Sequence, residues 1–325
     1  MMKVLGRIAL AGIATAGVSA AYGADEGLAW LTRMANASSH VNYSGTFVYH
    51  NRGSTETSRV VHFVNQAGGV FERLEALDGP AREVIRTNDL VTCYLPAIRT
   101  VRIEQRNAKL VPGMLPENLA EIGESYRVRL GGMGRIAGHE CQIVMLEPKD
   151  KLRYGREFCA EVKTALPLRV RTISDKREGV EAFAFTQLTI GGSFNRERVR
   201  SRYAAKSQGW RVDRSALSER EGETGWAVTQ QPAGFKKLLE VRRSIAGRAG
   251  SVAQIIFSDG LAAVSVFIEP SAGRRPAQTL THQGAVNIYT RPVADHLVTV
   301  LGEAPAATVM QIGNSLELRS STVAR

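Results

Sequence analysis

The stretch Tyr43-Ser44-Gly45-Thr46-Phe47-Val48-Tyr49 decides the fold of this chain, because aromatic residues alternate in it with small or β-branched ones. A period of two places successive side chains on opposite faces of a strand. The turn sequence Asn51-Arg52-Gly53 follows almost at once and predicts that the chain reverses there. We therefore expect residues 43–49 to belong to an antiparallel sheet.

Short strand-like segments continue beyond this stretch, with turn sequences between them such as Gly68-Gly69 and Asp78-Gly79-Pro80. Regular spacing of this kind is typical of an antiparallel meander. The expected strands cover residues 59–63, 70–77, 82–87, 90–94 and 98–105, and, after a break at 107–125, residues 126–130, 140–146, 154–162, 168–173 and 181–190.

Two segments beside these strands show helical spacing. Asp25 is a suitable cap for a helix that places Leu28, Leu31 and Ala35 on one face. In residues 107–125 the apolar residues also recur at helical spacing, which predicts a cover over the sheet. A curved sheet covered by two helical pieces would enclose an apolar interior. That interior is either a packed core, which is the default, or a cavity of lipid size.

Residues 1–23 resemble an export leader. Lys3 and Arg7 precede the apolar run 8–18, and Ala21-Tyr22-Gly23 offers a cleavage site before Ala24. The alternative is a membrane anchor, but the run is shorter than the roughly 20 residues that a membrane span requires. We therefore expect a cleaved leader and a protein that works outside the cytosol, in the periplasm.

The chain is basic, with a formal net charge of +11, and most of its 42 basic residues are arginine. A cytosolic protein of this charge would suggest nucleic acid, but export excludes that partner. Guanidinium groups suit phosphate and carboxylate, so anionic lipids and acidic protein segments are the expected partners. The alternative is that the arginines pair with the 31 acidic residues of the chain.

The pattern divides the chain into two domains of an α+β fold. A large β domain is expected at 24–192, an arginine-rich linker at 193–223, a small domain at 224–318 and a tail at 319–325. The small domain is predicted to combine an antiparallel sheet with one helix. Its expected strands cover 252–257, 261–268, 285–289 and 297–301, and its helix covers 305–316.

The three cysteines allow one internal disulfide. A hairpin centred near Asp150 would set Cys141 opposite Cys159, and an oxidising compartment permits the bond. Against the bond, Cys159 alternates with Glu157 and Glu161 on an apparent solvent face, and a slip of one residue in register would separate the pair. Both alternatives stay open at this stage.

The search for reactive chemistry gives no catalytic, cofactor or metal site. The histidines are scattered, and no pair of cysteines or histidines has the spacing of a zinc site. Gly132-Met133-Gly134 resembles part of a dinucleotide fingerprint, but a strand-like segment follows where a helix is needed. We expect those glycines to form a hairpin turn, and we expect a protein that is not an enzyme.

Several motifs together resemble the RseB/MucB family of periplasmic negative regulators of sigma-E type stress responses. They cover nearly the whole chain after the leader. The motifs are residues 43–49, residues 72–86 with Cys93-Tyr94-Leu95-Pro96, Pro148-Lys149-Asp150, Arg153-Tyr154-Gly155, residues 226–235, residues 257–270, residues 284–289 and residues 298–305. The chain departs from the family at Cys159, usually tryptophan there, and at Glu161, usually aspartate.

The resemblance implies that the large domain is a half-open antiparallel β-barrel with a helical lid, similar to lipoprotein carriers. It implies binding to the periplasmic part of a membrane-spanning anti-sigma factor, which shields that factor from proteolysis. Lipopolysaccharide or the acyl chains of lipoproteins would release the partner. The rival function is a lipid or lipoprotein carrier, and the sequence leaves a homo-oligomer open.

Candidate residues follow for three contacts. Those expected to line a lipid cavity are Tyr43, Phe47, Tyr49, Phe63 and Phe71, with Leu115, Leu119 and Ile122 in the lid; the alternative is a structural core. Those expected to meet anionic lipid are Arg73, Arg82, Arg86, Arg99 and Arg102. Those expected to bind the protein partner are Leu261, Val264, Val266, Phe267 and Ile268; the alternative is a central strand buried in its own domain.

Overall fold

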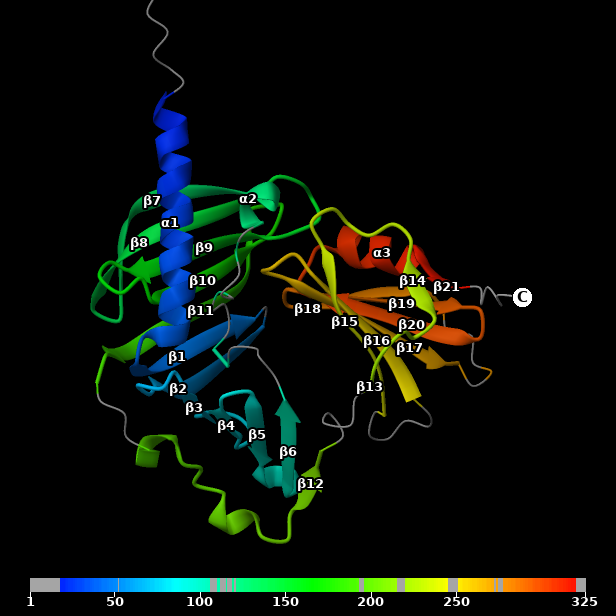
Figure 1. Cartoon of the computed structure of the whole chain (residues 1–325), viewed down its shortest axis with the longest axis horizontal. Coiled ribbons are helices and arrows are strands. Elements are labelled where there is room, and N and C mark those ends of the chain that lie inside the picture. The colour runs from blue at the N-terminus through cyan, green and yellow to red at the C-terminus, as the bar shows by residue number, and fades with distance from the viewer. Residues whose placement is uncertain are drawn as a thin grey trace, which may run out of the picture.

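The chain is mostly β, with few helices, and it forms a large sheet beside a smaller one (Figure 1). The computed structural model describes residues 18–319 except 52, 106–109, 112–114, 116–118, 120, 193–195, 215–219, 245–250, 272 and 274–276. Most of the expected leader and nearly all of the expected tail therefore lie outside the described residues. No described helix is both long enough and apolar enough to span a membrane.

The large sheet has twelve strands in the order β12-β6-β5-β4-β3-β2-β1-β11-β10-β9-β8-β7. The consecutive order from β1 to β6 is the predicted meander. The strands are β1 (Tyr43–Asn51), β2 (Ser54–Val64), β3 (Val70–Ala76), β4 (Glu83–Thr87), β5 (Leu90–Leu95), β6 (Thr100–Gln105), β7 (Tyr126–Ile136), β8 (His139–Pro148), β9 (Gly155–Glu161), β10 (Pro167–Ile173), β11 (Gly179–Ile190) and β12 (Arg211–Asp213). A 3-10 turn, η1 (Pro96–Ile98), joins β5 to β6.

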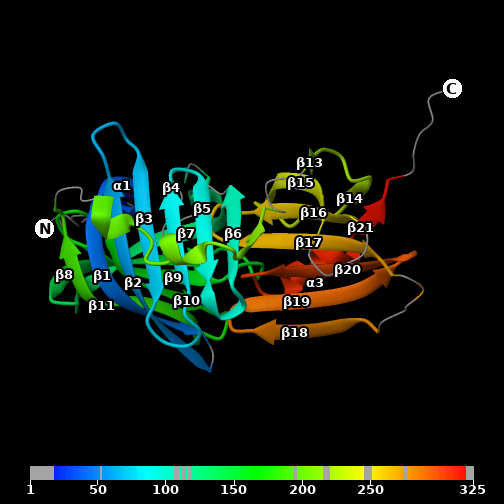
Figure 2. The same cartoon turned by 90° about the horizontal axis from the view of Figure 1, so that it is seen from below.

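Strand β1 joins the two halves of this sheet, because it pairs with β2 on one side and β11 on the other. Tyr43, for example, lies opposite His62 and Ile190. The sheet curls, so that β4–β6 pass in front of β7–β10 in Figure 2. It ends at β7 and β12 and is therefore open.

Helix α1 (Val18–His40) covers the β7–β11 half of the sheet (Figure 1). It begins before Asp25, so the prediction that Asp25 caps its start is wrong for the full-length chain. Leu31 and Ala35 are buried as expected, whereas Leu28 is exposed. Gly27 brings the helix close to β7, since a Cβ there would lie 2.8 Å from the Val128 side chain.

The predicted helix over residues 107–125 is confirmed only at its end, as α2 (Ile122–Ser125). Leu110, Leu115 and Leu119 are described and are not helical. Pro112 lies inside the predicted range, where it removes a backbone donor that a continuous helix needs. Residues 107–109, 112–114, 116–118 and 120 of this prediction lie outside the described residues. Leu115 and Ile122 are nevertheless buried in the core of the large domain.

The glycines at 132 and 134 lie within β7 and do not form the predicted turn. A bulge between Leu130 and Met133 accounts for the extra residues. The reversal occurs instead at Ala137 and Gly138, both with positive φ. Gly132 and Gly134 therefore belong to a bulged strand and not to a phosphate-binding loop.

The small sheet has seven strands in the order β13-β15-β16-β17-β20-β19-β18. Its predicted strands and helix are confirmed, while β13, β14, β15, β18 and β21 were not predicted. Helix α3 covers one face, and a two-stranded sheet of β14 and β21 adds to the domain. The elements are β13 (Arg220–Glu221), β14 (Trp226–Val228), β15 (Lys236–Ser244), β16 (Ser251–Ser258), β17 (Ala263–Pro270), β18 (Thr279–Gln283), β19 (Val286–Val293), β20 (His296–Gly302), α3 (Ala306–Asn314) and β21 (Leu316–Leu318).

The arginine-rich segment between the domains lies along the large sheet (Figure 1). We call residues 196–213 the strap; it contains η2 (Arg196–Val199), η3 (Ala205–Ser207) and β12. Its anchor is Glu83, which is fully buried. The Glu83 carboxylate accepts hydrogen bonds from the Ser201 hydroxyl and, at 3.0 Å, from the backbone N–H of Arg202.

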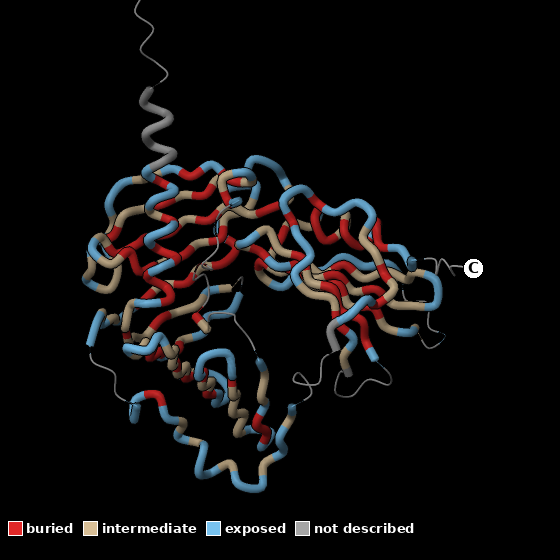
Figure 3. The backbone as a smooth tube through the Cα atoms, viewed as in Figure 1, coloured by how far each residue is buried: buried red, intermediate tan, exposed pale blue. Residues whose placement is uncertain are grey.

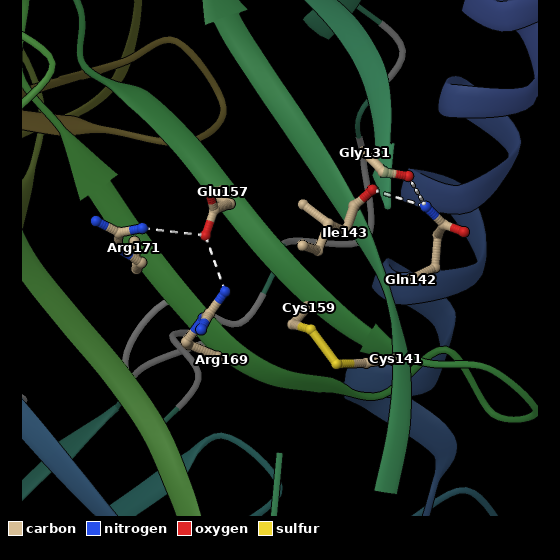
Figure 4. Close-up of a disulfide and its surroundings, with 8 residues drawn as sticks. All are labelled: Gly131, Cys141, Gln142, Ile143, Glu157, Cys159, Arg169 and Arg171. Atoms are coloured by element: carbon tan, nitrogen blue, oxygen red, sulfur yellow. Dashed lines mark hydrogen bonds and ion pairs between the residues drawn. A yellow bond between two sulfur atoms is a disulfide. The ribbon is translucent and has the colours of Figure 1, made fainter. Parts of the chain in front are cut away.

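Cys141 and Cys159 form a disulfide between β8 and β9 (Figure 4). The strand register sets Cys159 opposite Ile143 and Cys141 opposite Glu161, so the bond runs diagonally. The expected solvent face is wrong, since both cysteines are buried. Figure 3 shows that buried positions recur along the strands of both sheets. Gly134 of β7 covers them, because a Cβ there would lie 2.9 Å from the Cys159 Sγ.

We predict that the double substitution Cys141→Ala and Cys159→Ala lowers the free energy of unfolding by about 3 kcal/mol, because the bond closes a loop in the unfolded chain. Denaturant unfolding under non-reducing conditions measures this change. Thiol titration of the denatured, unreduced wild type should find one thiol. Three thiols would show that the bond is not formed.

Candidate functional site

The two domains meet around the side chain of Arg153, which lies between β8 and β9 and is buried. Its Nη1 donates to Asp259 Oδ2 of the small domain at 3.1 Å. Its Nε donates to Asp150 Oδ1 at 3.1 Å, and its Nη2 donates to the Ala233 carbonyl. One guanidinium therefore binds three acceptors from three separate segments of the chain.

Asp259 reaches the other domain because its own turn is fixed. Its Oδ1 accepts the backbone N–H groups of Leu261 at 3.0 Å and Ala262 at 2.8 Å. Gly260 supplies the positive φ, +94°, that this turn needs. The second oxygen, Oδ2, is then free to accept from Arg153 and from the Tyr126 hydroxyl, the latter at 3.0 Å.

Aromatic rings complete the surroundings of this guanidinium. The Arg153 Cζ lies 5.6 Å from the centre of the Tyr126 ring and 5.3 Å from that of Phe235. Burial, and then the negative charge of Asp259, raise the pKa of the Tyr126 hydroxyl well above its usual value. Tyr126 thus stays protonated and remains a donor to Asp259.

A second contact joins the β1 end to the turn between β18 and β19. A Cβ placed on Gly284 would lie 1.3 Å from Asn51 Oδ1, so any other residue there would have to displace the Asn51 side chain. Gly284 also has a φ of +61°. Glycine is therefore favoured at this position twice, by the positive φ of the turn and by the closeness of the Asn51 side chain.

A third contact lies between these two. Tyr154 Oη accepts from Asn287 Nδ2 at 2.9 Å, and Arg156 pairs with Glu303 at 3.2 Å. Burial, and then repulsion from Glu303, raise the pKa of the nearby Glu181 carboxyl. These three contacts define what we call the domain junction.

The structure separates the residues expected to line a lipid cavity. Tyr43, Phe47, Leu115 and Ile122 are buried in one hydrophobic cluster, with Tyr49 and Leu119 packed against it. Phe63 and Phe71 belong to another cluster that includes Val199 of the strap. Phe47 lies 4.9 Å from Phe183 between ring centres. The eight residues therefore do not form one site.

Four of the five arginines expected to meet anionic lipid are paired with acids. Arg99 is exposed, with a positive φ of 46°. The pairs are Arg73 with Glu83 at 2.7 Å, Arg82 with Glu56 at 3.4 Å, Arg86 with Glu72 at 3.2 Å and Arg102 with Asp213 at 3.4 Å. The alternative reading of the arginine excess, pairing within the chain, is confirmed for these four.

The expected partner-binding strand lies in the middle of the small sheet, as β17. Val264, Val266 and Ile268 are buried in the core of their own domain, which is the alternative stated above. Leu261 packs against the core of the large domain. Phe267 lies on the other face and is partly exposed, with the Arg243 Cζ 5.6 Å from its ring centre.

Sequence reasoning did not identify the domain junction as a site, although its residues stood in the quoted motifs. Arg153, Gly234-Phe235, Asp259 and Gly284 come from four of them. The available signal was an Asp-Gly turn and an arginine in a loop, which by themselves predict no contact between domains. Among the described residues, no group of three or more His, Cys, Asp or Glu side chains could hold a metal ion.

Comparison with known proteins gives a family for both domains. The model of the MucB/RseB N-terminal domain matches residues 26–203, and that of the MucB/RseB C-terminal domain matches residues 220–317. The Sigma factor AlgU regulatory protein MucB of Pseudomonas aeruginosa is 30% identical over 291 residues, covering 88% of this chain and 89% of that protein. The Sigma-E factor regulatory protein RseB of Escherichia coli K12 is 23% identical over 292 residues, covering 89% and 90%.

Solved structures give the same relationship. A crystal structure of MucB in complex with MucA(peri) superimposes with a TM-score of 0.73 at 27% identity, covering 91% of this chain and all of that one. The complex of Pseudomonas aeruginosa MucA and MucB gives a TM-score of 0.75 at 28% identity with coverage of 91% and 100%.

We predict that Asp259→Asn lowers the free energy of unfolding by about 3 kcal/mol, because it leaves the buried Arg153 charge without its partner across the junction. Thermal or denaturant unfolding measures the loss. Glu303→Gln is the matched control, since Glu303 also pairs with an arginine across the junction but is partly exposed. Its cost should stay below about 1 kcal/mol; equal costs would contradict a special role for Asp259.

We predict that Gly284→Ala separates the tip of the β18–β19 hairpin from β1, because the new methyl overlaps the Asn51 side chain. Small-angle scattering should show a larger radius of gyration. Adding Asn51→Ala removes the overlapping atoms and should restore part of the compactness, leaving only the strain of the positive φ. No difference between the single and double variants would argue against this contact.

Proposed function

Because the chain belongs to the MucB/RseB family, we propose that it binds the periplasmic region of a membrane-spanning anti-sigma factor and protects it from regulated proteolysis. The sigma factor then stays inactive until an envelope stress signal releases the partner. We infer that the chain works in the periplasm after removal of leader 1–23, and that it acts by occupancy and not by catalysis.

The observation that supports this function is the match of both family domains within one chain. The relatives compared above are named as regulators of sigma factors, and the solved MucB complexes contain MucA. A simple carrier needs only one ligand-binding domain. The buried junction supports a protein whose two domains act as one surface, because Arg153 and Asp259 are paired inside it.

We further propose that the large sheet acts as a half-open barrel with residues 107–125 as its lid, and that it receives the acyl chains of lipopolysaccharide or a lipoprotein. Each buried methylene would contribute about 0.8 kcal/mol. The proposal is restricted to Tyr43, Phe47, Leu115 and Ile122, which share one cluster, and to Tyr49 and Leu119, which pack against it. An acyl chain would have to displace some of these side chains, because they already pack in the core of the large domain.

Phosphate contact is proposed only for Arg99, because the other candidate arginines already have carboxylate partners. A phosphate could replace such a carboxylate only by leaving that acid unpaired. The cost is highest at Glu72 and Glu83, which are both buried. Arg99→Ala should therefore weaken binding to anionic lipid. Arg86→Gln, measured on folded protein, should weaken this binding less.

We predict that the leaderless protein retains the periplasmic region of its cognate anti-sigma factor in a pull-down and slows its cleavage by the first protease of the pathway. Lipopolysaccharide or a lipopeptide should restore cleavage. Failure of the wild type to retain the fragment would overturn the proposed function. Transfer of a labelled lipoprotein between membranes, without retention of the fragment, would favour the rival function of a lipid or lipoprotein carrier.

A further inference from the structure

The large and the small sheet end in four strands, and three of these are poor templates for another strand. The third sheet consists only of β14 and β21, with three residues each. Strand β12 has three residues, two of them charged, and β13 has two residues. Strand β7 carries the bulge between Leu130 and Met133. Short length, charge and bulges are the devices by which proteins keep sheet edges from pairing with other chains.

Strand β18, at the remaining end, has none of these devices. Its sequence Thr279-Leu280-Thr281-His282-Gln283 contains no proline, no glycine and no formal charge at neutral pH. All five residues are exposed. Its register with β19 runs without interruption from Thr279 opposite Thr290 to Gln283 opposite Val286. Figure 2 shows it along the outer border of the small domain.

Among the described residues, no strand pairs with the outer edge of β18, so its backbone presents hydrogen-bonding groups there at regular positions. Gly284 and Ala285 form a two-residue turn, and the φ of Gly284, +61°, fits a type II′ turn. In such a hairpin the closing pair, Gln283 and Val286, exchanges both hydrogen bonds, and bonded pairs then alternate along the strand. The N–H and C=O groups of Leu280 and His282 therefore point away from β19.

We propose that this edge binds an extended segment of the anti-sigma factor's periplasmic region, which adds an eighth strand to the small sheet. The inference rests on the function proposed above. Main-chain hydrogen bonds would supply affinity. Leu280, 46% exposed beside the buried Tyr289, would contact an apolar side chain of the added strand.

Charge decides between the two available occupants of the edge. Removal of the leader, which carries Lys3 and Arg7, lowers the net charge from +11 to +9, so a second copy would still bring a like net charge to the same edge. A neutral or acidic segment meets no such repulsion. The junction also fixes the strand, because Gly284 at its tip lies against Asn51. The partner strand would thus be held at a set position relative to the large domain.

The test compares Leu280→Pro with Val212→Pro in the otherwise intact leaderless protein. Proline at 280 removes only an outward N–H and adds bulk at the free edge. Val212 is an equally exposed residue, 46%, on the edge strand β12. Since Arg211 N–H donates to the Arg99 carbonyl at 3.0 Å, the Val212 N–H also points away from its sheet. The two substitutions are therefore matched in the residue introduced, in exposure and in backbone direction.

Isothermal titration with the cognate periplasmic fragment should show at least about a tenfold weaker Kd for Leu280→Pro and an unchanged Kd for Val212→Pro. In the wild type, the amide protons of Leu280 and His282 should exchange quickly when free and slowly in the complex. This second measurement stands even if Leu280→Pro does not fold.

The outcomes separate the two proposals. A wild type that does not bind the fragment overturns the proposed function. A wild type that binds, with Leu280→Pro binding equally well and no protection of the two amides, overturns the β18 docking site alone. A change in self-association of Leu280→Pro, with fragment binding intact, assigns the edge to a second copy and also overturns the docking site.

Discussion

The buried ion pair between Arg153 and Asp259 is the constraint on which the arrangement of this protein depends. Removing two charges from water costs several kcal/mol per ion, and their attraction offsets this only when the geometry is good and the remaining groups are satisfied. Here Asp150, the Ala233 carbonyl and the Tyr126 hydroxyl complete the pair. The main effect of this pair is to specify one relative position of the two domains, and its contribution to the stability of either domain is smaller. That relative position also fixes where the edge of β18 lies.

The sequence predicts the strand content well, because alternation in residues 43–105 directly reports one covered face. It overestimates the helix expected at 107–125, where the described Leu115 is buried without helical backbone. Strand β18 was not predicted, because all its side chains are exposed and no alternation of apolar and polar residues marks it. The disulfide stayed undecided because its cysteines are diagonal neighbours, and only the register shows that.

The candidate site was less predictable than the fold. Arg153 and Asp259 are 106 positions apart in the chain, and nothing local in either segment indicates the other. The arginine excess illustrates the same problem, since Arg73 and Arg86 face buried acids that only the strand pairing brings near. The composition shows that arginine side chains are abundant, whereas the tertiary contacts decide which of them already pair with acids inside the protein.

The strap limits how far a signal in the large domain can move the small domain. Since residues 196–213 are fastened to the large sheet through Glu83 and β12, only residues 214–219 remain between β12 and β13. A short tether keeps the second domain at an effective concentration on the order of millimolar beside its docking surface. Opening of the junction would then be brief and reversible. A lasting release of a partner therefore requires the small domain to rotate against the large domain, and not to separate from it.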